Sequence, residues 1–506
     1  MMIYFMRTKK ALINAIVSIV LQLITIVIGF ILPKIFLEAF GSEINGAISS
    51  ITQFLGSITL LEVGVGGVTR AALYKPLAEN DTYKISGIVN ATKQFFRKLA
   101  FIFVLYALFL ALTFKYISST ELGFTFVFTL VVIISVSQLS QYYFGSSYYI
   151  LLQADQNRYI SSSMDIVIII INTIITILLI KMGFNILVIK FISVFIYSLK
   201  PVLLSLYVSK KYRIDKAVPL DNEAIKQKWN GLGHHLAYYV QNNVDMMVVT
   251  VQLGLKWASV YSVYHMILWG VDGFLNSALS FKEAIYGNMI AKGEINLLKK
   301  RFVLMETISS ILNVVFYSTC GLLILDFIRI YTENIHDINY VITSVAILFI
   351  ATAYCTSVKD NFNDIVLAAG HYKQTQMSAF IEAGLNLFLS VILAHYLGLE
   401  GILIATIVSV SYRIIYYVLY LSKHIINRQP QAFIKRQMVN ALNIMFIVLS
   451  FGLFKFGVID NYLLWVGKAI IVFGYTIIIT LMFNLLFYKN DVKEGFNLLF
   501  STFKRK

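Results

Sequence analysis

The sequence has little charge, little proline and little cysteine. Of its 506 residues, 13% are charged, five are proline and two are cysteine. Because a soluble domain carries about 25% charged residues, this composition excludes an ordinary soluble protein. The chain also lacks a Gly-rich phosphate loop with Lys-Ser/Thr, an HExxH helix and a GxSxG elbow, so nothing in it predicts an ATPase, a zinc protease or a serine hydrolase.

Hydrophobic residues are what the chain has in excess. They make up 58% of it, and the mean hydropathy is +0.76. A membrane-spanning helix needs about 20 mostly apolar residues, and windows of that width give about fourteen candidate spans. We therefore predict an all-α polytopic membrane protein. The expected spans are 11–33, 46–74, 96–117, 122–151, 160–180, 185–208, 230–253, 257–281, 302–325, 339–367, 374–395, 398–421, 438–457 and 462–488.

The basic residues indicate the topology of the chain. If both termini are cytoplasmic, lysine and arginine concentrate in the inner loops, as the positive-inside rule requires. The outer segments then hold only Lys34, Lys115, Lys181, Lys256, Arg329 and Lys455. The net charge of +16 is mostly this signal, so it favours contact with anionic lipid headgroups and predicts no nucleic-acid partner.

An internal repeat divides the sequence into two halves. The stretch 151–184 aligns without gaps on 366–399, and the basic loop after the sixth span lies between the halves. Both halves begin on the same side, so the predicted pseudo-two-fold axis runs along the membrane normal. We expect two six-helix lobes, 1–209 and 230–424, joined by a cytoplasmic linker, 210–229. Residues 425–506 supply two additional spans and a cytoplasmic tail.

The quoted stretches "LEVGVGGVTRAALYKPLAEND" and "VLAAGHYKQTQ…IEAGLNLFLSVILAHYLGLEGILIATIVS" carry a family resemblance. Together with the two-lobe plan, they resemble the Wzx-type polysaccharide flippases of the multidrug/oligosaccharidyl-lipid/polysaccharide exporter superfamily. The resemblance covers essentially the whole chain, although its motifs are loose patterns of glycine, asparagine and small residues. It implies a V-shaped pair of lobes around a central cavity, and export of undecaprenyl-diphosphate-linked oligosaccharide by alternating access.

Charged residues inside the predicted spans are the candidate site residues. A charge at mid-bilayer costs about 3 kcal/mol, so it faces a partner or a wet cavity. Glu62 and Arg70 lie about 12 Å apart on a straight helix and about 80° around it, too far for a direct pair. Arg70 either lines the cavity or extends to the cytoplasmic face. The intervening glycines Gly64, Gly66 and Gly67 let another backbone approach or let the helix bend.

Basic candidates suit a lipid diphosphate, because arginine and lysine offset its negative charge. The predicted substrate-binding residues are Arg70, Lys190, Lys200, Lys359 and Arg413. Lys200 precedes Pro201, which kinks a helix, whereas Lys190 can extend to the outer surface. Lys359, Asp360 and Asp364 could instead form an intrahelical salt-bridge set.

Acidic candidates suit a coupling ion. The predicted ion-coupling residues are Glu62, Asp165, Asp245 and Glu382. The family often carries an asparagine–valine–aspartate pattern, which Asn243, Val244 and Asp245 match here. No cofactor is expected beyond coupling to H⁺ or Na⁺, and no metal site, because the adjacent His234 and His235 diverge by about 100° on a helix. Cys320 and Cys355 show no metal or redox spacing.

The tyrosines have two interpretations. "SQYYFGSSYYILL" holds four of them. They could stack on the sugar rings of a glycan, or mark the membrane interface.

The predicted function is transport, with no enzymatic step, in a bacterial cytoplasmic membrane. We expect a flippase for surface-polysaccharide repeat units that works with glycosyltransferases and a polymerase. The alternatives are a cation-coupled multidrug antiporter or a peptidoglycan-precursor flippase of the same superfamily. The alternative from another class is a membrane glycosyltransferase or polysaccharide polymerase. Such enzymes need a large outer loop or catalytic carboxylates in a cleft, and the predicted outer loops of this chain are too short.

Overall fold

The computed structural model describes residues 2–229, 232–454, 456–457 and 459–495, and all of the regular structure in them is helical. Within these residues, ten helices are long and apolar enough to cross a membrane. Helix α12 (Thr343–Ala368) is long enough, but Lys359, Asp360 and Asp364 lower its mean hydropathy. The chain therefore has the helical character of a polytopic membrane protein, whereas the layout with fourteen spans stays a prediction.

The chain divides into two compact units. Unit 1 comprises residues 1–239 and 254–259, and unit 2 comprises residues 240–253 and 260–506. The first residues of two helices, α8 (Leu232–Gln252) and α9 (Leu255–Leu279), belong to unit 1, and the rest of both helices belongs to unit 2. The predicted tail lies partly outside the described residues.

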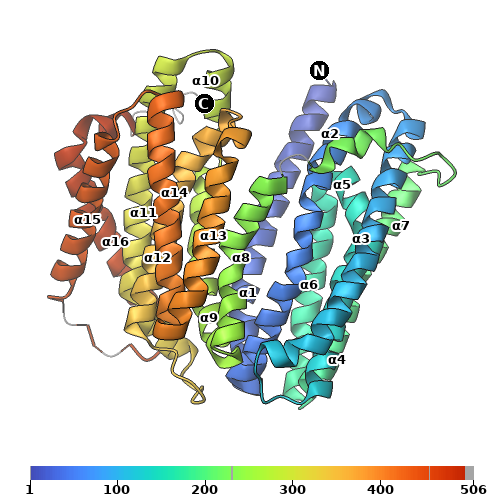
Figure 1. The fold of residues 1–506 in the computed structure, drawn as a ribbon, viewed down its shortest axis with the longest axis horizontal. Coiled ribbons are helices and arrows are strands. Elements are labelled where there is room, and N and C mark those ends of the chain that lie inside the picture. Colours follow the sequence, from blue (N-terminus) through green and yellow to red (C-terminus); the bar gives the residue numbers. More distant parts are fainter. Residues whose placement is uncertain (1, 230–231, 455, 458, 496–506) are drawn as a thin grey trace. The chain divides into compact units, whose positions relative to one another are not determined.

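Seven complete helices build unit 1 (Figure 1). They are α1 (Met2–Gly56), α2 (Val63–Glu79), α3 (Thr82–Ile117), α4 (Phe124–Ser140), α5 (Ser146–Ala154), α6 (Arg158–Lys181) and α7 (Ile186–Tyr212). A 3₁₀ turn, Ser57–Leu61, precedes α2, and a π-helical turn, Gln141–Gly145, joins α4 to α5. A second 3₁₀ segment, Glu223–Trp229, lies in the linker and packs on α2 and α3.

Unit 2 contains most of α8 and α9 and all of the later helices. They are α8 (Leu232–Gln252), α9 (Leu255–Leu279), α10 (Lys282–Ala291), α11 (Ile295–Tyr331), α12, α13 (Tyr372–Leu397), α14 (Leu399–His424), α15 (Gln431–Phe451) and α16 (Tyr462–Phe487). Helix α14 packs on α12 and α13, and α11 packs on both α12 and α16.

Local sequence explains where several helices begin. The Asp81 carboxylate accepts from the Lys84 N–H at 2.9 Å at the start of α3. Asn185 and Asn461 cap α7 and α16 in the same way. Such caps satisfy N–H groups that have no partner within the helix. The aligned stretches of the internal repeat also end alike, since Gly183 and Gly398 both have positive φ.

Two glycines shape the first long helix. Gly41 interrupts α1 with φ 78° and ψ 176°, a conformation that residues with a side chain rarely adopt. A Cβ atom on Gly46 would lie 1.8 Å from the Leu255 carbonyl oxygen, so only glycine allows this approach of α1 to the start of α9. The helix predicted over 46–74 is wrong as one straight element, because it breaks into the end of α1, the 3₁₀ turn and α2.

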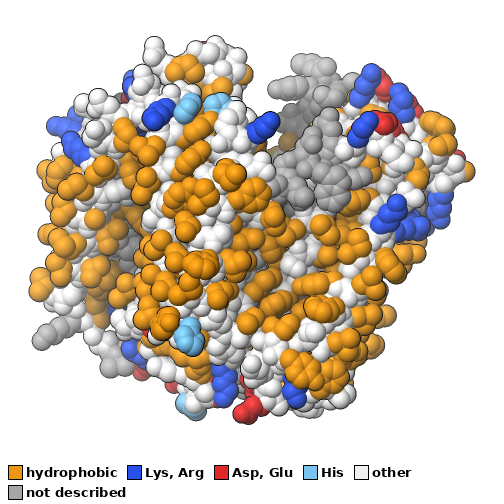
Figure 2. Space-filling model, in the orientation of Figure 1, with side chains coloured by type: hydrophobic (Ala, Val, Ile, Leu, Met, Phe, Trp, Pro, Cys, Tyr) orange, Lys and Arg blue, Asp and Glu red, His pale blue; other side chains and the backbone are white. Residues whose placement is uncertain are grey.

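The surface shows where each unit is apolar. On the face drawn in Figure 2, hydrophobic side chains cover the middle of each unit, and charged side chains gather towards its ends. On α3, Phe101, Leu105 and Phe109 are 67%, 55% and 60% exposed. Apolar side chains so exposed are expected where a helix faces lipid.

Candidate functional site

Helix α5 is the centre of a charged cluster in unit 1. It packs against α2, α3, α6 and α7 and follows the π-helical turn. A Cβ atom on Gly145 would lie 2.8 Å from the Cβ of Pro201, so a larger residue would not fit between the turn and α7. Turns of π-helix are frequent at functional sites, and this one positions the tyrosines of the segment.

Three cations of unit 1 have neutral partners around α5. Arg70 donates from Nη1 to Gln153 Oε1 at 2.7 Å, and Lys93 Nζ donates to the Tyr148 hydroxyl at 3.2 Å. The Arg97 guanidinium lies 5.1 Å from the centre of the Tyr143 ring. Among the residues that the structure describes, no carboxylate lies within 4.0 Å of these three cations. Their positive charge is therefore not neutralised by a direct ion pair.

The fourth cation of this cluster, Lys200, forms an ion pair with a carboxylate. Lys200 Nζ lies 2.7 Å from Asp165 Oδ1, and the two side chains are 18% and 29% exposed. The Lys200 ammonium also lies 5.7 Å from the centre of the Tyr149 ring. A predicted substrate-binding residue and a predicted ion-coupling residue are thus direct partners. Both side chains of the pair are therefore partly exposed.

The tyrosine-rich segment contacts cations at three of its four tyrosines. Tyr143, Tyr148 and Tyr149 meet Arg97, Lys93 and Lys200 respectively. The fourth, Tyr142, is buried and accepts a hydrogen bond from Gln138 Nε2 at 2.8 Å. The segment therefore forms the aromatic lining of the basic cluster.

Two further predicted residues of unit 1, Glu62 and Lys190, contact residues outside the basic cluster. Glu62 is the residue between the 3₁₀ turn and α2, and its N–H donates to the Thr59 carbonyl at 3.0 Å. The Lys190 ammonium lies 4.2 Å from the centre of the Phe36 ring, between α7 and α1. Glu62 thus marks the break in the helix that precedes Arg70.

In unit 2, three predicted residues form one buried triad. Glu382 on α13 faces Lys359 Nζ at 3.3 Å and Arg413 Nε at 3.5 Å, and all three side chains are at most 7% exposed. Arg413 also donates to the Thr375 carbonyl, to the Ser378 hydroxyl and to Tyr417 Oη. A guanidinium with so many buried partners is held in place.

Another ion pair of unit 2, between a buried lysine and a partly exposed aspartate, was not among the sequence predictions. Lys282 at the start of α10 lies 3.0 Å from Asp364 Oδ2 and donates to Asn361 Oδ1 at 3.1 Å. Lys359 and Asp364 have partners on other helices, α13 and α10, and the intrahelical salt-bridge set within α12 stays a prediction. The charged run "KDNFND" in α12 indicates that buried partners exist, but the helices that supply them could not be deduced from the spacing of its residues.

Asp245 lies in a buried cluster of oxygen atoms. It is 5% exposed and its Oδ2 accepts from the Thr406 hydroxyl at 2.8 Å, while Asn386 Nδ2 donates to the same hydroxyl at 2.9 Å. Asp245 Oδ1, Asn386 Oδ1 and Ser390 Oγ are buried without a hydrogen-bond partner in the described part of the chain. Buried polar atoms are normally satisfied. The cluster therefore offers oxygen ligands from α8, α13 and α14.

Neither family models nor curated relatives identify the chain. No protein-family model matches the sequence. The search of curated proteins also finds no match.

Solved structures do resemble this fold. An inward closed lipid II flippase MurJ superposes with a TM-score of 0.67 at 15% identity, covering 94% of this chain and 99% of the other. An inward-facing multidrug resistance MATE family transporter of the MOP superfamily gives 0.62 at 12% identity, covering 81% and 98%. A MATE transporter of Vibrio cholerae gives 0.55 at 13% identity, covering 83% and 99%. The chain therefore has the fold shared by these transporters.

Proposed function

We propose that the protein is a flippase for undecaprenyl-diphosphate-linked oligosaccharide units in a bacterial cytoplasmic membrane. The observation that supports this most is the set of unit 1 cations with neutral partners, Arg70, Lys93 and Arg97. A diphosphate brings about two negative charges, and guanidinium and ammonium groups bind phosphate oxygens through charge-assisted hydrogen bonds. The fold of a lipid II flippase is consistent with such a cargo.

The residues of the basic cluster have separable roles in this proposal. Arg70 exchanges its neutral partner Gln153 for a phosphate oxygen, and Lys200 exchanges Asp165. Tyr143 and Tyr149, which line the cations, offer ring faces and hydroxyls to the first sugars. Alternating access then carries the headgroup outward while the polyprenyl chain stays in lipid. Glycosyltransferases and a polymerase would supply and consume the repeat unit.

A transport assay tests the proposal. Protein in proteoliposomes would be given a fluorescent undecaprenyl-diphosphate-linked oligosaccharide, and its accessibility on each face would be followed. We expect Arg70→Gln to slow flipping by about tenfold, since a hydrogen bond to a charged group contributes about 1.5–3 kcal/mol. Lys75→Gln is the matched control, because Lys75 is 81% exposed and pairs with Glu79. Equal rates for the two variants would contradict the proposal.

The rival functions of the same superfamily predict other cargoes. A multidrug antiporter of the MATE type would move organic cations, and a peptidoglycan-precursor flippase would move lipid II. The same vesicles can be offered a cationic dye and lipid II. Export of the dye with no flipping of lipid-linked glycan would favour the antiporter.

We also propose that the cluster around Asp245 binds the coupling ion, Na⁺ or H⁺. A carboxylate with neutral oxygen atoms beside it suits a hard monovalent cation or a proton, and here those atoms come from Asn386 and Thr406. Asp245→Asn keeps the shape and removes the charge. We expect its flipping rate to lose dependence on Na⁺ (compared with K⁺) or on pH, whereas Asp460→Asn, in an exposed loop, should retain it. A variant that keeps the wild-type dependence would exclude Asp245 as the ion site.

A further inference from the structure

The linker between the units is bound along α3 of unit 1. Asn90 Nδ2 donates to the carbonyls of Asp215 and Val218 at 2.9 and 3.2 Å, and the Asp221 N–H donates to the Gly87 carbonyl at 3.2 Å. Further along, the linker buries Ile225, which is 2% exposed. The linker is thus a fixed part of unit 1, and it covers the first half of α3.

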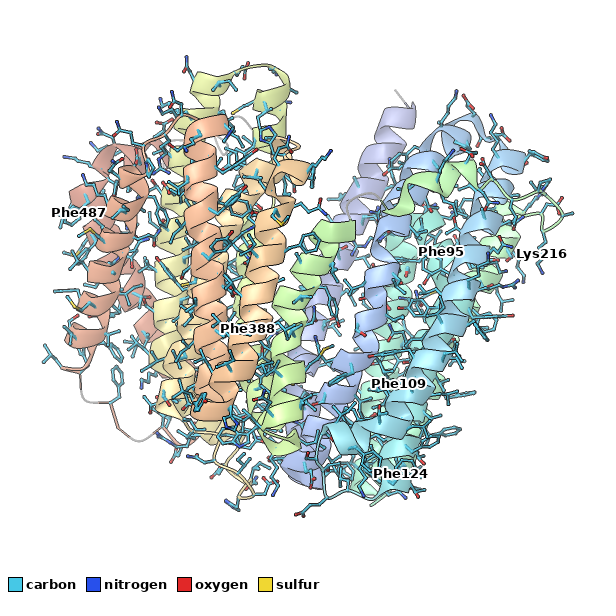
Figure 3. The ribbon with its side chains drawn as sticks, viewed as in Figure 1. Phe95, Phe109, Phe124, Lys216, Phe388 and Phe487 are labelled. Atoms are coloured by element: carbon cyan, nitrogen blue, oxygen red, sulfur yellow. The ribbon has the colours of Figure 1, made fainter. Side chains whose placement is uncertain are left out.

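A cavity lies between this linker and the helices. Its volume is about 280 Å³, and we call it the linker pocket. Apolar side chains form most of its wall: Leu61 from the 3₁₀ turn, Phe95, Leu99 and Ile102 from α3, and Ile225 from the linker. Figure 3 shows Phe95 on α3, close to the linker. The pocket is therefore apolar and large enough for part of an acyl chain.

Polar groups gather at one part of the same wall. Gln94 and Lys98 lie one turn apart on α3, and Asn222 lies on the linker; all three are exposed. In the described part of the chain, no carboxylate lies within 4.0 Å of the Lys98 ammonium. The pocket thus combines an apolar wall with the positive charge of Lys98, which no described carboxylate pairs with directly.

The position of the linker pocket along α3 indicates where it lies relative to the membrane. After Lys98 the helix continues with the apolar run "LAFIFVLYALFLALTF", and Phe101 is 67% exposed. Before Lys98 the helix carries Lys93 and Arg97. Basic residues next to a lipid-facing run mark the level of the lipid headgroups, and basic pockets on the cytoplasmic side bind anionic headgroups.

From these observations we infer that the linker pocket binds an anionic glycerophospholipid of the surrounding membrane. The headgroup phosphate would lie at Lys98, with Gln94 and Asn222 as hydrogen-bond donors, and an acyl chain would enter along Leu99 and Ile102. A bound lipid would contact α3, the linker and Leu61 together. Because Leu61 precedes Glu62, the lipid would also stabilise the break before α2.

Lipid retention measured on the intact protein tests this inference. The full chain would be purified in detergent with equal phosphatidylglycerol and phosphatidylcholine, and bound lipid would be counted by native mass spectrometry. We expect phosphatidylglycerol to be preferred, and Lys98→Gln to lower that preference about fivefold, the factor that one lysine at an anionic surface produces. Lys84→Gln is the control on the same helix, because Lys84 pairs with Asp81 away from the pocket. Equal retention of the two lipids by the wild type, or equal behaviour of both variants, would overturn the inference.

A pocket-filling variant tests the place of the acyl chain. Gln94 is exposed at the pocket, so Gln94→Trp can fill the space without disturbing a buried contact. We expect it to lower retention of both lipids while the protein elutes as one folded species. Full retention by this variant would show that Lys98 attracts lipid without the cavity, which would contradict an acyl chain in the linker pocket. The measurement needs no transport, so its failure is distinct from failure of the proposed function.

Discussion

The two units differ in the partners of their cations. In unit 1, Arg70, Lys93 and Arg97 contact a glutamine and two tyrosines, whereas Lys200 pairs with the Asp165 carboxylate. In unit 2, Lys359, Arg413 and Lys282 all face carboxylates. The sequence places cations in both halves alike. What differs is the partner, which only the packing of helices supplies.

This difference predicts a division of labour between the units. A buried cation that is paired with a carboxylate has little charge left for a ligand, and removing its partner destabilises the unit. A cation with a neutral partner keeps its attraction for an anion and adds little to folding. We therefore expect substitutions in the unit 2 triad to affect stability first, and substitutions in the unit 1 cluster to affect substrate first.

The largest expected effect is in unit 2. Glu382→Gln removes the charge of the carboxylate that faces Lys359 and Arg413, and breaking a buried pair costs about 3–5 kcal/mol. Unfolding followed in detergent should show this loss of free energy. Glu79→Gln removes an exposed i,i+4 partner and serves as the control, with little change expected. If the two variants unfold alike, the triad is not the stabilising element we describe.

The next effect concerns the unit 1 cations. Arg97→Gln removes a stacked cation whose contribution to stability is about 0.5–1 kcal/mol, so the protein should remain folded. Its affinity for the diphosphate lipid should fall about tenfold, in line with the loss of a charge-assisted hydrogen bond. Titration of the fluorescent lipid into purified protein measures this. If Arg97→Gln lost stability while its affinity for the lipid stayed unchanged, Arg97 would behave like a residue of the unit 2 triad, contrary to our expectation.

A smaller effect of opposite sign sharpens the role of Lys200. Asp165→Asn removes its competing carboxylate, and a partly exposed ion pair is worth up to about 1 kcal/mol. Affinity for the diphosphate lipid should therefore rise by up to about fivefold, whereas Lys200→Gln should lower it. The same titration compares the two. Lowered affinity in both variants would mean that the pair acts only as a structural contact.

The smallest expected effect is the dependence on salt. Raising KCl from 0.1 to 1 M shortens the screening length from about 10 to about 3 Å. Binding at the partly exposed unit 1 cluster should weaken with KCl, while the stabilisation by Glu382 should change little, because that triad is at most 7% exposed. Titrations and unfolding curves at both salt concentrations test the contrast. Salt-insensitive binding would argue against an electrostatic site.

The helical character of this protein could be predicted because it follows from local composition. Apolar runs of sufficient length need lipid as their solvent, and this is readable without any tertiary contact. The break at Glu62 was harder to predict. Glycines at 64, 66 and 67 allow a bend, but whether a helix bends depends on what packs against it.

The candidate residues could be found from the sequence, but their partners could not. A charge in an apolar span indicates that a partner exists, and this reasoning selected Lys200, Asp165, Lys359, Arg413 and Glu382. Which of them meet depends on the packing of α6 on α7 and of α13 on α12 and α14. Lys93 and Arg97 were not among the candidate residues, because the tyrosines that contact them come from a segment about fifty residues away.

The sequence by itself determined the solvent of this chain and the presence of charge within its helices, since both depend only on the order of apolar and charged residues. Tertiary structure decided which charges are neutralised. Coulombic pairing acts over a few ångströms between helices distant in sequence, so no periodicity along one helix can encode it. The triad cations and Lys282 in unit 2 thus face carboxylates, whereas Arg70, Lys93 and Arg97 in unit 1 contact neutral groups. If Arg97→Gln and Glu382→Gln changed the free energy of unfolding and the affinity for the diphosphate lipid by the same amounts, that distinction would be wrong.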